Sequence, residues 1–405
     1  MPGKRILIVA VGDALPETQQ DKLRPLIPSM KKTVLALAGK TYSPHFDYAV
    51  AGLGGLQTAI ASYLDPPSTK PDVIFAIASE ATKAARDVVR NDPRARGIPI
   101  VFTVVSEPDQ EPQGDPFAPS PPRAERITGV SRGLVQSTRE AVSKFTQVVN
   151  RTLHVHWIHR QGLFQGDRAH TNITNPPPLP MQHSRHYPKA PNCNGVLDAI
   201  KQNIPPNTSP TEPLAGLFLI PDDLVGCYAG EMIRCAHDPS RKIPTLVQQL
   251  EWVCRPPDDP MGPPALAGYG VTPEWVGTKA GDYVHKVILT PDEAKRLDVL
   301  TPLDGDREFW INLQVAQDLN VPLCHPLPKW AKPCPSQGSR GAAAKAKAPR
   351  GAATKGPAKK AKKKPAAKGE AGRKRPKAKR TAKGKKASQR KRSARRAARR
   401  QRKRK

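Results

Sequence analysis

The sequence predicts an α/β protein with two lobes of parallel β-sheet, followed by a basic tail. Three observations support this class. Short Val/Ile-rich runs alternate with amphipathic helical patterns through the first 150 residues. The same alternation starts again at Leu153–His159. The composition then changes abruptly after Pro333, where Lys, Arg, Ala, Gly and Pro replace nearly everything else. Alternating strands and helices of this kind are typical of parallel sheets covered on both faces.

The strands of the first lobe are expected from their continuous apolar runs. The ranges are Lys4–Val11, Phe46–Leu53, Asp72–Ala78, Ile98–Val105 and Arg126–Val130. Helices are expected at 17–37, 56–64, 80–90 and 137–150, the third opened by Ser79 as its N-cap. In the second lobe we expect strands at 153–159, 214–220, 265–269 and 309–313, and helices at 194–202, 224–236, 275–289 and 314–320.

Proline, asparagine and histidine dominate the stretch 162–213, which is therefore expected to be mostly irregular. Residues 1–135 and 290–330 are assigned to the first lobe, 136–289 to the second, and 331–405 to the tail. The six cysteines show no metal-binding spacing and are expected to be reduced thiols, since disulfide frameworks are typical of short secreted chains.

Charge separates the tail from the rest of the chain. The 405 residues carry 66 Lys+Arg and 35 Asp+Glu, a net charge of +31. Residues 339–405 hold 31 of the basic residues and one acid, Glu370, which leaves a body of net charge +1. Without aromatic or large aliphatic residues, this segment is expected to be disordered when free.

Such a tail is expected to bind DNA or RNA through phosphate neutralisation and without reading sequence. Its lysine/alanine-rich runs resemble the tails of linker histones and bacterial histone-like proteins. The candidate nucleic-acid contacts are Lys359, Lys360, Lys362, Lys363, Lys364, Arg373, Lys374, Arg375, Arg395, Arg396, Arg399 and Arg400. A merely solubilising tail, or one that touches anionic lipid, remains an alternative.

Several segments of the body resemble the ABC-transporter substrate-binding proteins of the tryptophan/tyrosine type, which have the type I periplasmic-binding fold. They are PDVIFAIASEATKAA, IPIVFTVVSEPDQ, ITGVSRG, GLFLIPDDLV, PALAGYGVTPEWVGTKAGDYVHKVI and FWINLQVAQDLNVPLCHPL, which together span about 1–330. The resemblance implies two lobes that close by hinge motion on a small solute, often an aromatic amino acid.

Parallel sheets bind ligands at the carboxyl ends of their strands. The candidate ligand contacts there are Asp13, Ser79, Thr82, Ser106, Glu107, Asp222 and Tyr269. Ser79 and Thr82 at a helix N-terminus suit a ligand carboxylate, Asp222 suits an amine, and Ser106 and Glu107 occupy the matching strand end of the first lobe. Four of these residues have a structural alternative: helix capping for Ser79, Thr82 and Asp222, and an aromatic packed at a lobe edge for Tyr269.

Other chemistry is not expected. The histidines at 154, 156, 159, 170, 183 and 186 fit no metal-site spacing, and no cofactor motif or nucleophile–base pair is present, so neither a metal, a cofactor nor enzymatic activity is predicted. No apolar run is long enough for membrane insertion. The N-terminus lacks a secretory leader, so a cytoplasmic, nucleoid location is expected unless an upstream signal was lost.

Two functions therefore remain open. One is a solute-binding domain that carries a nucleic-acid-binding tail. The other is a nucleoid-associated, histone-like structural protein whose body has lost ligand binding. A cytoplasmic chain has no permease to serve, so a permease partner is not expected.

Overall fold

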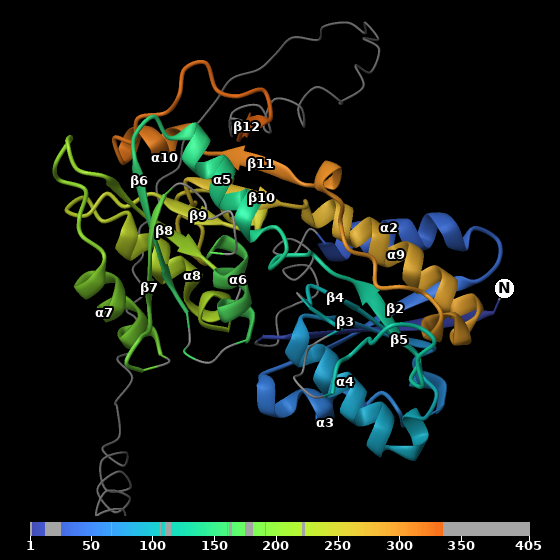
Figure 1. Cartoon of the computed structure of the whole chain (residues 1–405). Coiled ribbons are helices and arrows are strands. Elements are labelled where there is room, and N and C mark those ends of the chain that lie inside the picture. The colour runs from blue at the N-terminus through green and yellow to red at the C-terminus, as the bar shows by residue number, and fades with distance from the viewer. Residues whose placement is uncertain are drawn as a thin grey trace, which may run out of the picture. The chain divides into compact units, whose positions relative to one another are not determined.

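A computed structural model describes residues 2–12, 26–65, 67–105, 107–109, 115–159, 161, 164–174, 181–190, 192–220 and 223–334. These residues form two α/β lobes, each built on its own sheet (Figure 1). The predicted fold class is confirmed. The nucleic-acid contacts predicted in the tail lie outside the described residues.

The first lobe has a five-stranded sheet in the order β2-β1-β3-β4-β5, with every neighbouring pair parallel. Its strands are β1 (Gly3–Val11), β2 (Ser43–Ala51), β3 (Val73–Ile77), β4 (Ile100–Thr103) and β5 (Ile127–Val130). All residues of β3, β4 and β5 are buried, which explains their continuous apolar sequences.

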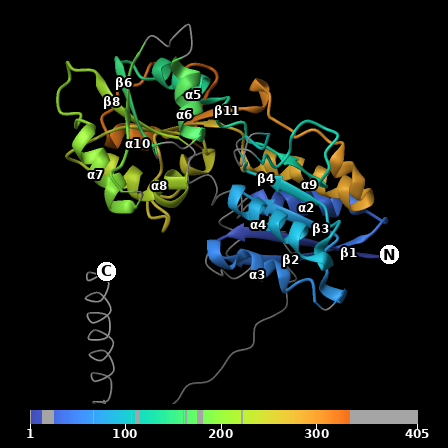
Figure 2. The same cartoon turned by 60° about the horizontal axis from the view of Figure 1, so that its bottom comes forward.

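Helices cover both faces of this sheet (Figure 2). On one face, α2 (Leu26–Ala38) packs against α9 (Pro273–Leu289). On the other lie α3 (Leu56–Ala61) and α4 (Ser79–Asn91). The helix α4 buries Ala81, Ala84, Ala85 and Val88, and this spacing places them on one stripe toward the sheet.

The second lobe has a seven-stranded sheet in the order β12-β11-β10-β9-β8-β6-β7. Its strands are β6 (Leu153–Ile158), β7 (Gln182–His186), β8 (Leu214–Leu219), β9 (Thr245–Val247), β10 (Ala267–Gly270), β11 (Glu308–Ile311) and β12 (Ala331–Pro333). Neighbours are parallel except β10 and β11, which run antiparallel.

The core of the second lobe also has two layers. One face of the sheet carries α5 (Thr138–Val148), α6 (Phe164–Thr174) and α10 (Leu313–Asp318), and the other carries α7 (Cys193–Asn203) and α8 (Asp223–Ala236). Short 3-10 turns complete the described elements: η1 (Leu53–Gly55), η2 (Pro67–Thr69), η3 (Pro93–Ala95), η4 (Leu250–Trp252), η5 (Pro291–Lys295) and η6 (Asp304–Asp306).

The lobes differ from the predicted boundaries near the C-terminal end of the body. The helix α9 packs in the first lobe, although its residues were assigned to the second. The strands β11 and β12 extend the second sheet, although β11 lies in 290–330, which was assigned to the first lobe, and β12 begins the range 331–405, which was assigned to the tail. The chain therefore crosses between lobes three times: after β5, after β10 and before β11.

Two local expectations are corrected. Besides α7, which matches the helix expected at 194–202, the stretch 162–213 contains α6 and β7, so it is more regular than predicted. Ala78, with φ of 75°, takes the N-cap position of α4, and Ser79 is the first helical residue instead.

The prediction that all cysteines are reduced is also wrong. Cys254 follows η4 and Cys334 follows β12, and the two form a disulfide across a sequence separation of 80 residues. The fold brings their Cα atoms to 5.5 Å, a distance that the sequence alone does not specify. Cys193, Cys235 and Cys324 are free.

Candidate functional site

A buried carboxylate lies just beyond the carboxyl end of β4. Glu107 is 1% exposed, and its Oε1 lies 3.2 Å from Nη1 of Arg168, which comes from α6 of the second lobe. Burial raises the pKa of Glu107, and the positive charge of Arg168 works in the opposite direction. The ion pair with Arg168 is therefore the main interaction that offsets the cost of burying the Glu107 carboxylate.

The first crossing between the lobes carries a second, partly buried ion pair. Arg132 follows β5, has a side chain only 5% exposed, and donates to Glu251 of η4 at 3.0 Å. Gln248, at the end of β9, donates through Nε2 to the carbonyl oxygen of Leu134 and to Oγ of Ser137 at 3.0 Å. These bonds fix the strand ends of the second lobe against the connection from the first.

Buried polar atoms without a hydrogen-bond partner gather at these strand ends. Among the described residues, five such side-chain atoms belong to residues at or just beyond the ends of β4, β5 and β9: Thr103 Oγ1, Glu107 Oε2, Arg132 Nε, Gln248 Oε1 and Glu251 Oε2. Others, such as Trp157 Nε1 and Arg241 Nε, lie elsewhere in the second lobe. Unpaired buried polar groups are costly and rare, so such a group of them marks a place prepared for polar contacts.

The predicted ligand contacts fall into four groups, of which the last is Tyr269. Glu107 lies at the site just described. Thr82 is fully buried and donates through Oγ1 to the carbonyl oxygen of Ala78 at 2.9 Å, so its hydroxyl is used within the α4 terminus. Ser79, beside it, is half-buried. Asp13, Ser106 and Asp222 lie outside the described residues.

Tyr269 is located in the core of the second lobe. The side chain is 1% exposed and belongs to the cluster that contains Trp157, Phe218 and Phe309. Lys144 Nζ lies 5.6 Å from the centre of its ring. Burial and the neighbouring Glu140 raise the pKa of Tyr269 well above its usual value. Tyr269 is therefore a packed aromatic residue, which was the structural alternative. Its burial does not support the prediction that it lines a cleft.

Sequence reasoning missed four residues of the site: Arg132, Arg168, Gln248 and Glu251. Arg132 lies two residues after the end of the ITGV strand, and this position beyond a strand end was the one available signal. Arg168 lies in a stretch that was expected to be irregular.

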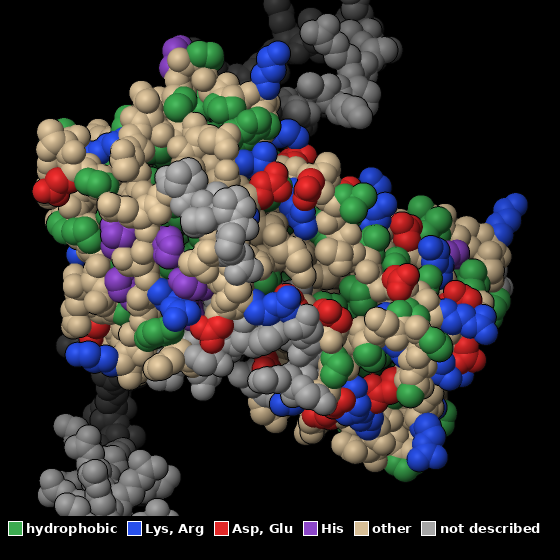
Figure 3. All heavy atoms as spheres, viewed as in Figure 1, with side chains coloured by type: hydrophobic (Ala, Val, Ile, Leu, Met, Phe, Trp, Pro, Cys, Tyr) green, Lys and Arg blue, Asp and Glu red, His purple; other side chains and the backbone are tan. Residues whose placement is uncertain are grey.

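Histidines gather at the β6–β7 edge of the second lobe (Figure 3). His156 Nδ1 lies 3.0 Å from His186 Nε2, and its ring stacks on that of His154 at 4.2 Å. Burial lowers the pKa of His156 to about 3. Among the described residues, no group of three or more His, Cys, Asp and Glu side chains is placed to hold a metal ion. Within the same residues, no helix is both long and apolar enough to span a bilayer.

Comparisons with known proteins identify solved structures that have a similar fold. No family model matches the sequence, and no curated protein matches it significantly. Solved structures do match. A conserved domain protein from Vibrio cholerae aligns over 82% of this chain and 99% of its own, with a TM-score of 0.58 and 16% identity.

Two further structures align over 82% of this chain and all of their own length. One is an ABC domain in complex with L-Trp from Streptococcus pneumoniae, with a TM-score of 0.57 and 13% identity. The other is a substrate-binding protein with adhesive properties from Clostridium difficile, in its ligand-free, open form, with a TM-score of 0.54 and 17% identity. The body of this chain therefore has the two-lobed fold of periplasmic-type binding proteins.

Proposed function

We propose that the body binds a small solute, such as an amino acid, at the strand ends where the two lobes meet. The observation that carries this proposal is the group of unpartnered buried polar atoms around Glu107 and Arg132. The fold supports it, because one similar structure was solved in complex with L-Trp. Binding, rather than a catalysed reaction, is the proposed activity.

Glu107 is the proposed contact for a ligand ammonium group. Its Oε1 faces Arg168, whereas its Oε2 has no partner among the described residues. A charge-assisted hydrogen bond from an amine would satisfy that oxygen and reduce the cost of burying the carboxylate. Because Arg168 belongs to the other lobe, the ligand would bind where hinge closure changes the local contacts.

A melting experiment with a panel of amino acids and sugars tests this proposal. A true ligand at 100 times its dissociation constant should add about 2.7 kcal/mol to the free energy of unfolding. Glu107→Gln should weaken that ligand at least about tenfold, because a charged hydrogen bond contributes roughly 1.5–3 kcal/mol. The matched control is Glu80→Gln, at an exposed position in the first turn of α4. If no solute shifts the melting of the wild-type protein, the proposal fails.

We further propose that residues 339–405 bind nucleic acid without sequence preference. The support is the net charge of +30 that these residues carry. If about ten phosphates are neutralised, the logarithm of affinity should fall with log[salt] at a slope near −9. Gel retardation of the full chain, compared with a chain ending at Cys334, measures this slope. Salt-insensitive retardation would contradict the mechanism.

The alternative function is a nucleoid-associated structural protein whose body no longer binds ligand. It predicts salt-sensitive DNA binding together with a body that no solute stabilises. The same two experiments therefore separate the alternatives.

The cellular compartment of the protein is also a matter of proposal, and two features favour different compartments. Nucleic-acid binding by the tail requires a cytoplasmic, nucleoid location. The Cys254–Cys334 disulfide is instead typical of an oxidising compartment. Alkylation of thiols in rapidly quenched cells decides between them: a cytoplasmic protein should expose reactive Cys254 and Cys334, and an exported one should not.

A further inference from the structure

A large cavity lies wholly within the second lobe, apart from the site between the lobes. It has a volume of about 840 Å³ and is bounded by the end of α8, the loop after η4 and the start of α10. The Cys254–Cys334 disulfide forms part of its wall. None of Glu107, Arg132 and Gln248 lines it.

The wall of this cavity is largely apolar. Pro263 and Pro264 come from the loop, Val315 comes from α10, and Leu319 directly follows that helix. Leu313, 43% exposed, also lines the cavity. Small-molecule pockets typically have volumes of about 300–1,000 Å³ and mostly apolar walls with a few polar groups, so both size and lining fit.

Several contacts hold the cavity in shape. Asn312 accepts from Val315 N at 3.1 Å and donates to Val253 O at 2.9 Å, which joins α10 to the loop. Gly230 of α8 approaches the loop so closely that a Cβ would overlap the Met261 carbonyl. The disulfide adds a covalent link. A cavity that is already formed demands little ordering when a ligand enters.

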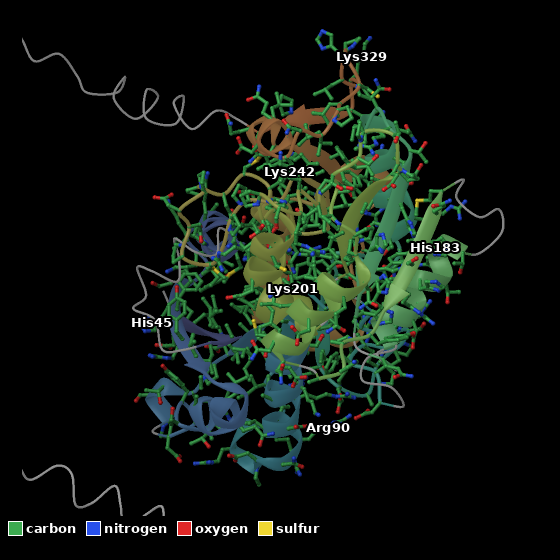
Figure 4. The ribbon with its side chains drawn as sticks, turned by 90° about the vertical axis from the view of Figure 1, so that its left-hand side faces the viewer. His45, Arg90, His183, Lys201, Lys242 and Lys329 are labelled. Carbon is green, nitrogen blue, oxygen red and sulfur yellow. A yellow bond between two sulfur atoms is a disulfide. The ribbon has the colours of Figure 1, made fainter. Side chains whose placement is uncertain are left out.

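The charges around the cavity leave one cation without an acidic partner. Arg255 pairs with Asp259 at 3.6 Å, and Asp318 accepts from Gln314 at 2.9 Å. For Lys242, labelled in Figure 4, no ion pair with an acidic side chain of the described segments is formed, and its Nζ lies 3.0 Å from the side-chain amide of Asn320. Burial lowers the pKa of His237 to about 4, so this lining residue is neutral at pH 7. An apolar wall beside an ammonium that has no acidic partner suits an anion with an apolar body.

We propose that this cavity is a second ligand site, which takes a small organic anion with an aromatic or aliphatic body. The carboxylate or sulfonate contacts Lys242, and the apolar part packs against the prolines and Val315. This site is independent of the solute site between the lobes, and neither proposal requires the other.

The test is a fluorescence titration of the full chain with 1-anilinonaphthalene-8-sulfonate, an aromatic sulfonate that brightens on leaving water. Salt at about 0.5 M suppresses attraction to the basic tail and screens a partly buried contact much less. One saturable site is expected. Lys242→Gly should weaken the binding of the dye about fivefold or more, because a charged contact is lost. The residue has φ of 53°, which glycine adopts without strain, so this variant should fold.

A second variant tests the location of the dye. Leu313→Trp adds bulk at an exposed lining position and should block entry while leaving the core intact. Lys201→Gln, a cation of the same lobe that does not line the cavity, is the matched control and should bind the dye normally. Absence of saturable binding would overturn the proposal. Equal binding by Lys242→Gly, Leu313→Trp and the wild type would also overturn it, as would an equal loss in Lys201→Gln.

Discussion

The two lobes share one architecture but are held together by different chemistry. In the first, Arg86 and Arg90 of α4 clamp the 115–125 loop through Asp115 and Glu125, with Arg86–Asp115 at 2.8 Å and Arg86–Glu125 at 2.6 Å. In the second, a disulfide links β12 to the loop after η4, and neutral histidines pack along the β6–β7 edge. The stability of the first lobe should therefore depend mainly on salt, and the stability of the second on reductant and mild acid.

The largest expected effect comes from removing the disulfide. Cys254→Ser combined with Cys334→Ser should lower the free energy of unfolding of the second lobe by about 4 kcal/mol, because an 80-residue loop regains entropy when unfolded. Hydrogen exchange should accelerate in β10 and β11 and remain unchanged in β1 and β3. Cys193→Ser, which removes a free thiol from the start of α7, should leave both lobes unchanged. Equal acceleration in both lobes would show that they unfold as one unit.

Mild acid should produce the next largest effect. Burial, followed by the charges of His154 and His186, lowers the pKa of His156 to about 3, below its unfolded value of about 6.5. Between these values the unfolded chain binds more protons, so stability falls as the pH falls. At pH 5 the protonation of His156 alone should lower the free energy of unfolding of the second lobe by about 2 kcal/mol.

The variant His156→Gln should therefore reduce the loss of second-lobe stability between pH 7.5 and pH 5, as measured by hydrogen exchange in β6. The control is His45→Gln in the first lobe, where the side chain is 59% exposed. A wild-type second lobe that is as stable at pH 5 as at pH 7.5 would contradict the contribution of the buried histidines.

The smallest effect is expected from the ion pairs that Arg86 and Arg90 form with the 115–125 loop of the first lobe. Hydrogen bonding from Arg90 lowers the pKa of Asp115 to about 2, so its contribution is present above about pH 4 and is lost as the pH falls toward 2. Because the Asp115 side chain is 53% exposed, Asp115→Asn should cost less than about 1 kcal/mol, and high salt should reduce the difference further. A larger, salt-independent loss in thermal melts would indicate a packing role instead.

The fold was predictable where burial is complete. The strands β3, β4 and β8 are buried throughout and apolar except for Thr103, so their runs stand out in the sequence. The edge strand β7 reads QHSRH and has no apolar residue, which left no strand signal. Among the residues of α6 whose side chains the structure describes, Ala169 and Ile173 alone belong to the core, too few for a clear helical period.

The site was predictable to the extent that it follows strand ends. Glu107 was identified because it lies just beyond the end of a predicted buried strand, 98–105. Its partner Arg168 is 61 residues further along the chain and on the missed helix, so only the folded arrangement joins them. The pairing of Cys254 with Cys334 was unpredictable for the same reason, since spacing alone does not define connectivity.

The disulfide also determines how mechanical tension would pass into the body. If residues beyond Cys334 attach to a long polyanion, any pull enters the second lobe at β12, a three-residue edge strand. Hydrogen bonds to β11 alone would let this strand peel away one residue at a time. The bond to Cys254 instead diverts the force into the loop that borders the second cavity. Under tension, the sheet and the cavity should keep their shape for as long as this bond remains oxidised.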